Sequence, residues 1–87
     1  MAMHAQSEDE RIKVHGKITD ASTKKAIPYV SVRIKNSANG SSSDSNGNFS
    51  FYSPINKLDT LVVSSLGYAE EYIAITRTSM PLKIKLK

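Results

Sequence analysis

The segment Gly40–Phe51 limits the possible fold more than any other part of the chain. Residues 44–47 read Asp-Ser-Asn-Gly. This combination is typical of tight turns, because Asp and Asn side chains accept hydrogen bonds from nearby backbone amides and Gly adopts positive φ without a clash. Phe49 and Phe51 follow at a spacing of two, which places both rings on one face of a strand. We therefore expect a β-hairpin, in which Ser41–Ser43 pairs across the turn with the strand that carries the two rings.

After residue 10, the rest of the chain repeats this alternation of apolar and polar side chains. Strand-like patterns occupy residues 12–19, 29–35, 61–65, 71–77 and 82–87. Residues that favour turns lie between them, and no segment keeps a helical period over ten residues or more. Val62 and Val63 are adjacent, which predicts that part of their strand is covered on both faces. Six or seven short strands at this spacing predict an all-β protein, an antiparallel β-sandwich.

Length and composition indicate one small domain. A chain of 87 residues buries only about 60–65% of its unfolded surface, which suffices for one core but not for a core and a roomy catalytic cleft. The chain has no cysteine, so disulfides and thiolate metal sites are excluded. Because no run approaches the roughly 20 apolar residues of a membrane span, we expect no direct membrane insertion. Residues 1–10 lack periodicity and are expected to form a flexible tail before a domain of residues 11–87.

The charge is unevenly distributed along the chain. The formal net charge is +4, but residues 11–87 carry twelve basic and five acidic side chains, a balance of +7. Nucleic acid is one partner that such an excess attracts. The alternative is that the lysines, which alternate with apolar residues, form solvated strand faces and discourage edge-to-edge association. Without an arginine cluster or a nucleic-acid-binding motif, we do not expect nucleic-acid binding.

No complete metal site is visible in the sequence. The segment that starts at Asp44 resembles half of a calcium loop, which needs Gly at its sixth position and Glu at its twelfth. Here Gly47 is fourth and Ile55 is twelfth, so turn chemistry explains these residues better. His4 and His15 belong to no zinc-binding pattern. We expect neither a metal nor any other cofactor.

Catalytic constellations are equally incomplete. Serines are plentiful, but none lies in a G-x-S-x-G motif. Glu70 and Glu71 are adjacent, and neighbours on a strand point to opposite faces, so they do not form a dyad. We therefore predict that the chain is not an enzyme. Its tyrosines either form an aromatic platform for sugars or bury their rings and keep their hydroxyls in water; they are Tyr29, Tyr52, Tyr68 and Tyr72.

Four motifs, in order and at matching intervals, resemble those of the carboxypeptidase-regulatory-like domain. The family pattern is a V-x-G-x-V strand ending in Asp, a P-L-x-x-V-x-V strand, a G-T-x-T-D-x-x-G-x-F hairpin and an L-x-V-S-x-x-G-Y segment. The corresponding segments here are Val14–Asp20, Ile27–Val32, Gly40–Phe49 and Leu61–Tyr68. The motif residues, which we expect to be structural, are Gly16, Asp20, Pro28, Gly40, Asp44, Gly47, Phe49, Gly67 and Tyr68. The chain departs from the pattern at two places. Ser41 and Ser43 stand where the family usually has threonines, and Tyr29 follows the proline where the family has leucine.

The resemblance implies a transthyretin-like, antiparallel Greek-key β-sandwich of about seven short strands. Such domains often stand at the N-terminus of TonB-dependent receptors and other envelope proteins of Bacteroidetes-type bacteria. It thus implies a non-catalytic accessory, spacer or docking module of a larger exported protein, in the periplasm, outer membrane or cell surface of a Gram-negative bacterium. The enzymes of similar fold are not matched, because the chain lacks a zinc peptidase motif and ends at Lys83–Lys87 where hydroxyisourate hydrolases have Y-R-G-S.

The partner implied is the remainder of the same polypeptide, and a peptide could also add to an edge strand. The alternative is a glycan- or peptide-binding module that uses the region of Tyr52 and Tyr68 with the Ser-rich loop. Because Lys87 lies within a strand pattern, we expect that the chain is a module cut from a longer protein. The junction Ala5-Gln6 resembles a signal-peptidase site, and vector-derived residues would explain it equally well.

Overall fold

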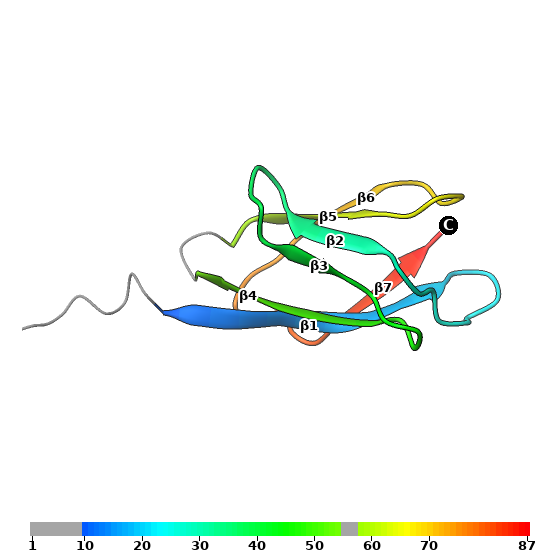
Figure 1. Ribbon diagram of the computed structural model, residues 1–87, viewed down its shortest axis with the longest axis horizontal. Helices are drawn as coiled ribbons and strands as arrows, with labels where there is room; N and C mark the ends of the chain where they lie inside the picture. The colour runs from blue at the N-terminus through cyan, green and yellow to red at the C-terminus, as the bar shows by residue number, and fades with distance from the viewer. Residues whose placement is uncertain (1–9, 55–57) are drawn as a thin grey trace, which may run out of the picture.

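The computed structural model describes residues 10–54 and 58–87, which form seven strands and no helix, in two layers (Figure 1). The strands are β1 (Arg11–Asp20), β2 (Ser31–Ile34), β3 (Gly40–Ser42), β4 (Asn48–Pro54), β5 (Thr60–Ser64), β6 (Glu71–Ala74) and β7 (Leu82–Leu86). One sheet has the order β4-β1-β7 and the other β3-β2-β5-β6. This arrangement confirms the predicted all-β sandwich. In the described part of the chain, no helix could cross a membrane.

The core lies between the two sheets. It includes Phe49 as expected, whereas Phe51 is only partly buried against it. Its buried side chains are Val14, Ile18, Ile27, Val30, Val32, Ile34, Phe49, Leu61, Val63, Ile75, Ile84 and Leu86. The alternation places these side chains inward because successive residues of a strand face opposite sides of its sheet. Val62, which points away from this cluster, is also buried, as predicted for a strand covered on both faces. Its cross-strand neighbours are Arg33 and Tyr72.

One strand pair departs from the antiparallel arrangement. β1 and β7 run parallel, in a register from Gly16↔Leu82 to Asp20↔Leu86, whereas all other named strand pairs are antiparallel. β6 belongs to the opposite sheet, so the chain changes layers before β7 and no hairpin dictates the direction of β7. Gly16 permits the close approach, because a Cβ atom there would lie 2.3 Å from the carbonyl oxygen of Leu82.

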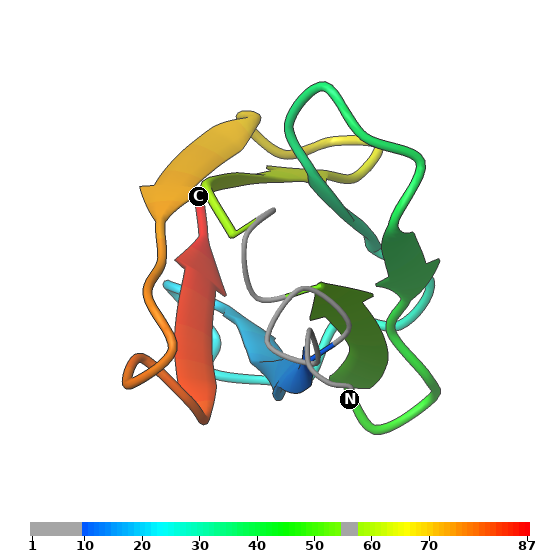
Figure 2. The same ribbon diagram turned by 90° about the vertical axis from the view of Figure 1, so that its left-hand side faces the viewer.

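The expected hairpin between Ser41–Ser43 and the following strand is wrong. β3 pairs with β2, whereas β4 pairs with β1, so the two strands lie in different sheets. The physical reason is that the turn carries the chain from one layer to the other, with β3 and β4 at the same side of the sandwich (Figure 2). Ser43 anchors this crossing: its buried hydroxyl donates to the carbonyl of Ile27 and accepts from the amide of Val30, both at 2.8 Å.

One predicted strand is shorter in the structure, and some expectations concern residues that the structure does not describe. The strand predicted at 71–77 ends at Ala74, after which the amide of Ile75 donates to the carbonyl of Asp59 at 3.1 Å. The tail with its signal-peptidase or vector interpretation, including His4, lies almost wholly outside the described residues. So does Ile55, at the twelfth position of the calcium-loop comparison.

Candidate functional site

Two motif residues that are far apart in the sequence form one hydrogen-bonded cluster. Asp20 ends β1, and its Oδ1 accepts hydrogen bonds from the backbone amides of Ser22 (2.7 Å) and Thr23 (2.8 Å). Its Oδ2 accepts another from the hydroxyl of Tyr68 at 2.8 Å. The amide of Thr23, and next the Tyr68 hydroxyl, lower the pKa of Asp20 below its ordinary value, because these bonds favour the carboxylate. The cluster joins the loop after β1 to the turn after β5.

The Asp44–Gly47 turn has the expected local geometry. Oδ1 of Asp44 accepts hydrogen bonds from the amides of Asn46 and Asn48, each at 2.9 Å. The amide of Gly47 donates to the carbonyl of Asp44 at 2.9 Å, and Gly47 has φ +80°. A Cβ atom at Gly47 would lie 2.6 Å from the carbonyl oxygen of Ile18. The turn therefore uses one carboxylate oxygen for its own amides and requires glycine for both conformation and space.

The remaining motif residues are dispersed over the fold. Phe49 is buried and pairs across the ladder with Gly16. Gly40 is the first residue of β3, and Pro28 is exposed in the segment before β2. Gly67 has φ +88° in the exposed turn before Tyr68. The motif positions thus belong to separate turns and ladders, and only Gly16, Asp44 and Phe49 of them line one groove.

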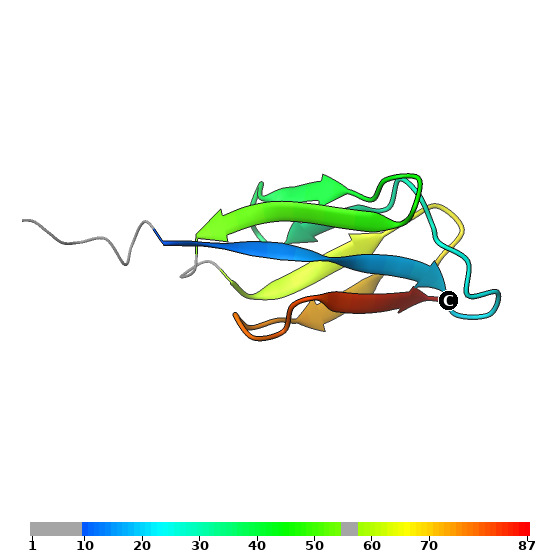
Figure 3. The same cartoon turned by 90° about the horizontal axis from the view of Figure 1, so that it is seen from below.

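A different set of residues gathers on the outer face of the three-stranded sheet, which Figure 3 shows from its outer side. These side chains point away from the core because successive residues of a strand face opposite sides of the sheet. The residues between them pack into the core. We call the set the basic face. It consists of Lys13, His15 and Lys17 on β1, Asn48, Ser50 and Tyr52 on β4, and Lys83 and Lys85 on β7.

The register brings the lysines of β1 and β7 together. Lys17 pairs with Asn48 on one side and with Lys83 on the other, so the three form one row across the sheet. Lys13 lies opposite Tyr52 in a second row. Neighbouring strands are about 4.8 Å apart, and like charges directly opposite each other destabilise a sheet. The basic face therefore concentrates positive charge at a cost to the isolated fold.

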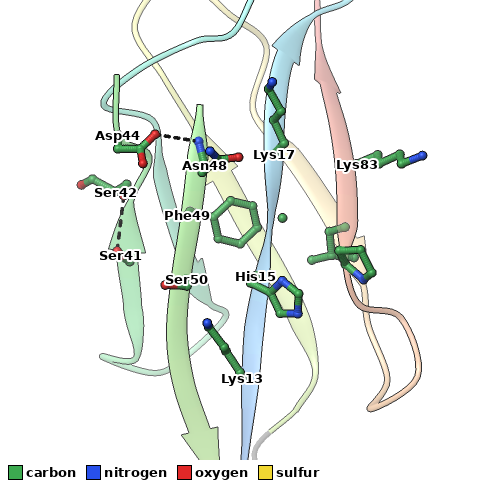
Figure 4. A pocket seen from close by; sticks show the side chains of 13 residues that line it. Lys13, His15, Lys17, Ser41, Ser42, Asp44, Asn48, Phe49, Ser50 and Lys83 are labelled. Atoms are coloured by element: carbon green, nitrogen blue, oxygen red, sulfur yellow. Dashed lines mark hydrogen bonds between the residues drawn. The ribbon is translucent and has the colours of Figure 1, made fainter. Parts of the chain in front are cut away.

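A groove of about 630 Å³ runs along the basic face. Its lining includes six basic-face residues, together with Ser41 and Ser42 of β3 and Asp44 of the turn. Figure 4 shows the lysine and histidine side chains of β1 beside the polar side chains of β4, with Lys83 on the neighbouring strand. The groove thus combines ammonium groups with hydroxyl and amide groups that can form hydrogen bonds.

Acidic side chains of the described residues are mostly engaged elsewhere. Glu10 contacts Arg77 at 3.4 Å, which is the one salt bridge in the described part of the chain. Glu70 accepts a hydrogen bond from the hydroxyl of Tyr72 at 2.8 Å, which raises the pKa of that tyrosine. Asp44 is the single described carboxylate in the groove lining. No described carboxylate therefore forms an ion pair with a basic-face lysine.

The tyrosines do not form one aromatic platform. Tyr52 lies opposite Lys13 near the start of β1, whereas Tyr68 is bonded to Asp20 at its end. Seven residues of strand separate these positions along β1, or roughly 23 Å. Tyr29 and Tyr72 are exposed on the other layer. The proposed combination of Tyr52 and Tyr68 in one ligand site is therefore not assembled.

The described residues present no catalytic or metal-binding geometry. No group of three or more His, Asp or Glu side chains in these ranges is placed to hold a metal ion. Ser50 lies opposite His15 on the basic face, so a potential nucleophile faces a potential base there. Among the described hydrogen bonds none joins them, whereas an activated nucleophile lies within hydrogen-bond reach of its base.

Two sheets around one apolar core, with motif residues in turns and ladders, define a small β-sandwich module. The chain belongs to the CarboxypepD_reg-like domain family, which matches residues 14–87. This domain is a β-sandwich module of a regulatory, non-catalytic type. No curated protein and no solved structure matches the chain.

Sequence reasoning missed the basic face as a site. Its signal was present, because the lysines alternate with apolar residues at 13–17 and 83–87, and they were interpreted as ordinary solvated strand faces. The two segments are about 65 residues apart in the chain, and only the parallel register of β1 and β7 places Lys17 beside Lys83.

Proposed function

We propose that this module is a non-catalytic spacer or docking unit of a larger exported cell-envelope protein, N-terminal to an outer-membrane TonB-dependent receptor or a similar membrane-associated part. Its partner is the remainder of its own polypeptide. The family supports a module without chemistry of its own. The envelope setting rests on the motif resemblance.

The parallel pairing of β1 and β7 is the observation that carries the spacer role. Because the end of β1 pairs with the end of β7, Arg11 and Leu86 lie at opposite ends of the module (Figures 1 and 3). The ten residues of β1 span roughly 30 Å at 3.3 Å per residue. A polypeptide that continues on both sides would enter at one end and leave at the other, which holds its flanking parts apart.

The location is tested in cells that carry the native gene. An antibody raised against the purified module is used on cytosolic, periplasmic and membrane fractions, and the coding sequence after Lys87 is read. We expect the signal in the envelope fractions and alternating amphipathic segments of about ten residues in the continuation. A cytosolic signal, or a continuation into a cytosolic enzyme, would overturn the proposal.

The absence of catalysis is tested on the purified protein with ester, peptide and glycoside substrates. We expect no turnover above the buffer rate. His15→Ala is the matched variant, because His15 is the single histidine in the described ranges. Turnover by the parent that this variant loses would show that His15 takes part in catalysis and would contradict the proposal.

A further inference from the structure

We propose that the basic face is a docking surface for an extended acidic polypeptide segment. The inference deepens the proposed docking role, on which it rests, by naming the surface and the chemistry of its partner. Backbone pairing with an edge strand is no part of it: the partner would lie across the exposed side chains of β1, β4 and β7 and beside Ser41 and Ser42 of β3.

The first support is the unbalanced charge. Lys17 and Lys83 are direct cross-strand neighbours, and both side chains are exposed. Such a pair destabilises the sheet, and among the described residues no carboxylate forms an ion pair with either lysine. An anionic partner placed between the two ammonium groups would remove this repulsion. The surface therefore favours negative charge at a defined place and not merely through the net charge of the chain.

The second support is the spacing of the charges. Lys13, His15 and Lys17 follow one another at every second position of β1, which is about 6.6–6.8 Å between successive side chains. An extended peptide with Asp or Glu at alternate positions has the same repeat. Its carboxylates would therefore meet the side chains of β1 one by one, with Lys83 reaching the same row as Lys17.

The third support is the shape and polarity of the surface. The groove along the basic face has a volume of about 630 Å³ and is also lined by Ser41, Ser42, Asn48 and Ser50. Hydroxyl and amide groups of this kind can bond the backbone of an extended chain. Asp44 keeps one oxygen on the turn amides, including that of Asn48 beside Lys17. Because it would repel a carboxylate, the acidic residues are expected nearer to Lys13 and Lys83.

Other anionic partners fit this surface less well. Single-stranded nucleic acid is bound by several aromatic platforms together with basic side chains, and Tyr52 is the one aromatic side chain of the basic face. A lipid bilayer attracts basic side chains through its anionic headgroups but offers no extended backbone to the hydroxyl and amide groups that line the groove. Single-stranded nucleic acid and lipid vesicles are therefore both tested beside the peptide.

The test uses the whole 87-residue protein and a fluorescent peptide of alternating Glu and Ser, with a Gln-Ser peptide as the neutral control. Binding is measured by fluorescence anisotropy at low salt, and the amide resonances that shift are mapped by NMR. The basic-face variant is Lys13→Gln/Lys17→Gln/Lys83→Gln. The matched control is Lys24→Gln/Lys25→Gln/Lys35→Gln, which removes the same charge from exposed positions outside the basic face.

We expect saturable binding of the acidic peptide and weakening as salt rises from about 0.05 to 0.2 M. The shifts should be confined to β1, β4, β7 and the groove-lining residues of β3 and the Asp44 turn. The basic-face variant should lose at least about tenfold in affinity, the equivalent of about 1.4 kcal/mol, and the control should lose much less. Equal losses in the two variants, shifts elsewhere, or no saturable binding would overturn the proposal.

Oligothymidine and anionic phosphatidylserine vesicles are titrated in parallel. Binding of either that is tighter than peptide binding and lost in the basic-face variant would overturn the acidic-peptide assignment in favour of that partner. Fractionation of cells reports separately on the proposed envelope role. If the protein is found in the envelope but does not bind the peptide, the docking surface fails while the proposed function stands.

Discussion

Gly47 and Gly67 show how two glycines with similar backbones can differ in what they contribute. Their φ angles are +80° and +88°. A Cβ atom on Gly47 would meet the carbonyl oxygen of Ile18 at 2.6 Å and the Cβ of Ala26 at 3.0 Å, whereas a Cβ on Gly67 would meet nothing within 4 Å. Gly67 is therefore needed only for its conformation, and Gly47 is needed for conformation and space.

Gly67→Ala should lower the free energy of unfolding by about 1–2 kcal/mol, the cost of holding an L-residue in the left-handed region. Gly47→Ala should cost clearly more, because the new methyl group also displaces the backbone of β1. Urea denaturation of the two variants and the parent measures the difference. Equal costs would show that the surroundings of Gly47 relax freely, and an unchanged midpoint for Gly47→Ala would contradict the turn itself.

Asp20 makes the stability of the module depend on pH. Hydrogen bonds from Thr23, Tyr68 and Ser22 lower its pKa in the folded state, whereas the unfolded value is about 3.9. The unfolded chain therefore binds more protons between the two values, and stability from this group rises with pH there. The contribution is fully present above about pH 4–5 and is lost as pH falls through the folded-state value.

Asp20→Asn should therefore be less stable than the parent at neutral pH, and the difference should narrow as pH falls below about 4. Thermal unfolding across this range measures it. Tyr68→Phe, which removes one of the bonds to the carboxylate, should give a smaller change in the same direction. A difference between Asp20→Asn and the parent that stays constant with pH would contradict the lowered pKa.

At the scale of elements, the connection between β3 and β4 decides the architecture. The two strands flank a short turn but belong to different sheets. The crossing is held by Ser43, whose backbone amide and carbonyl bond Val30 and Tyr29 while its buried hydroxyl bonds Ile27 and Val30. One small polar residue thus fixes the chain after β3, where it leaves the four-stranded sheet, to the segment that precedes β2.

Ser43→Ala should lower the free energy of unfolding by at least about 1–3 kcal/mol, because it leaves a buried amide and a buried carbonyl without their hydroxyl partner. Ser42→Ala is the control: its side chain is exposed, and surface substitutions usually change stability by no more than about 0.5 kcal/mol. Chemical denaturation compares the two. If both variants lose similarly little stability, water or a shifted backbone must satisfy the amide of Val30 and the carbonyl of Ile27.

At the scale of the whole molecule, charge is distributed by sheet and not only by sequence. The three-stranded sheet presents four lysines on its outer face, whereas the acidic side chains of the described residues lie in turns, at the two ends of β1 and around the four-stranded sheet. Such a division makes one face of the module attractive to anions. It leaves no cluster of carboxylates and histidines among the described residues that could hold a cation.

Calcium and zinc should therefore leave the melting temperature unchanged. A ligand at a hundred times its dissociation constant would stabilise the folded state by about 2.7 kcal/mol, which thermal unfolding detects readily. Chelator-treated protein is the reference. A rise in melting temperature that chelator reverses would contradict the interpretation of Asp44–Asn48 as a simple turn.

Local features of the fold could be predicted from the sequence because their causes are local. The period of two in residues 12–18 and 82–86 depends only on the geometry of a strand, so the inward and outward faces of β1 and β7 follow directly. The Asp44–Gly47 turn depends on bonds within five residues, and it was predicted correctly. These parts of the architecture would be the same in any sandwich built from this chain.

Pairing between strands was decided only by the tertiary structure. β3 and β4 are separated by a tight turn but lie in different layers, and β1 pairs in parallel with a strand more than sixty residues away. The basic face and the Asp20–Tyr68 bond arise from such distant pairings. Their physical cause is the packing of both sheets around one core, in which each strand takes the position that buries its apolar side, and no short segment of sequence contains that information.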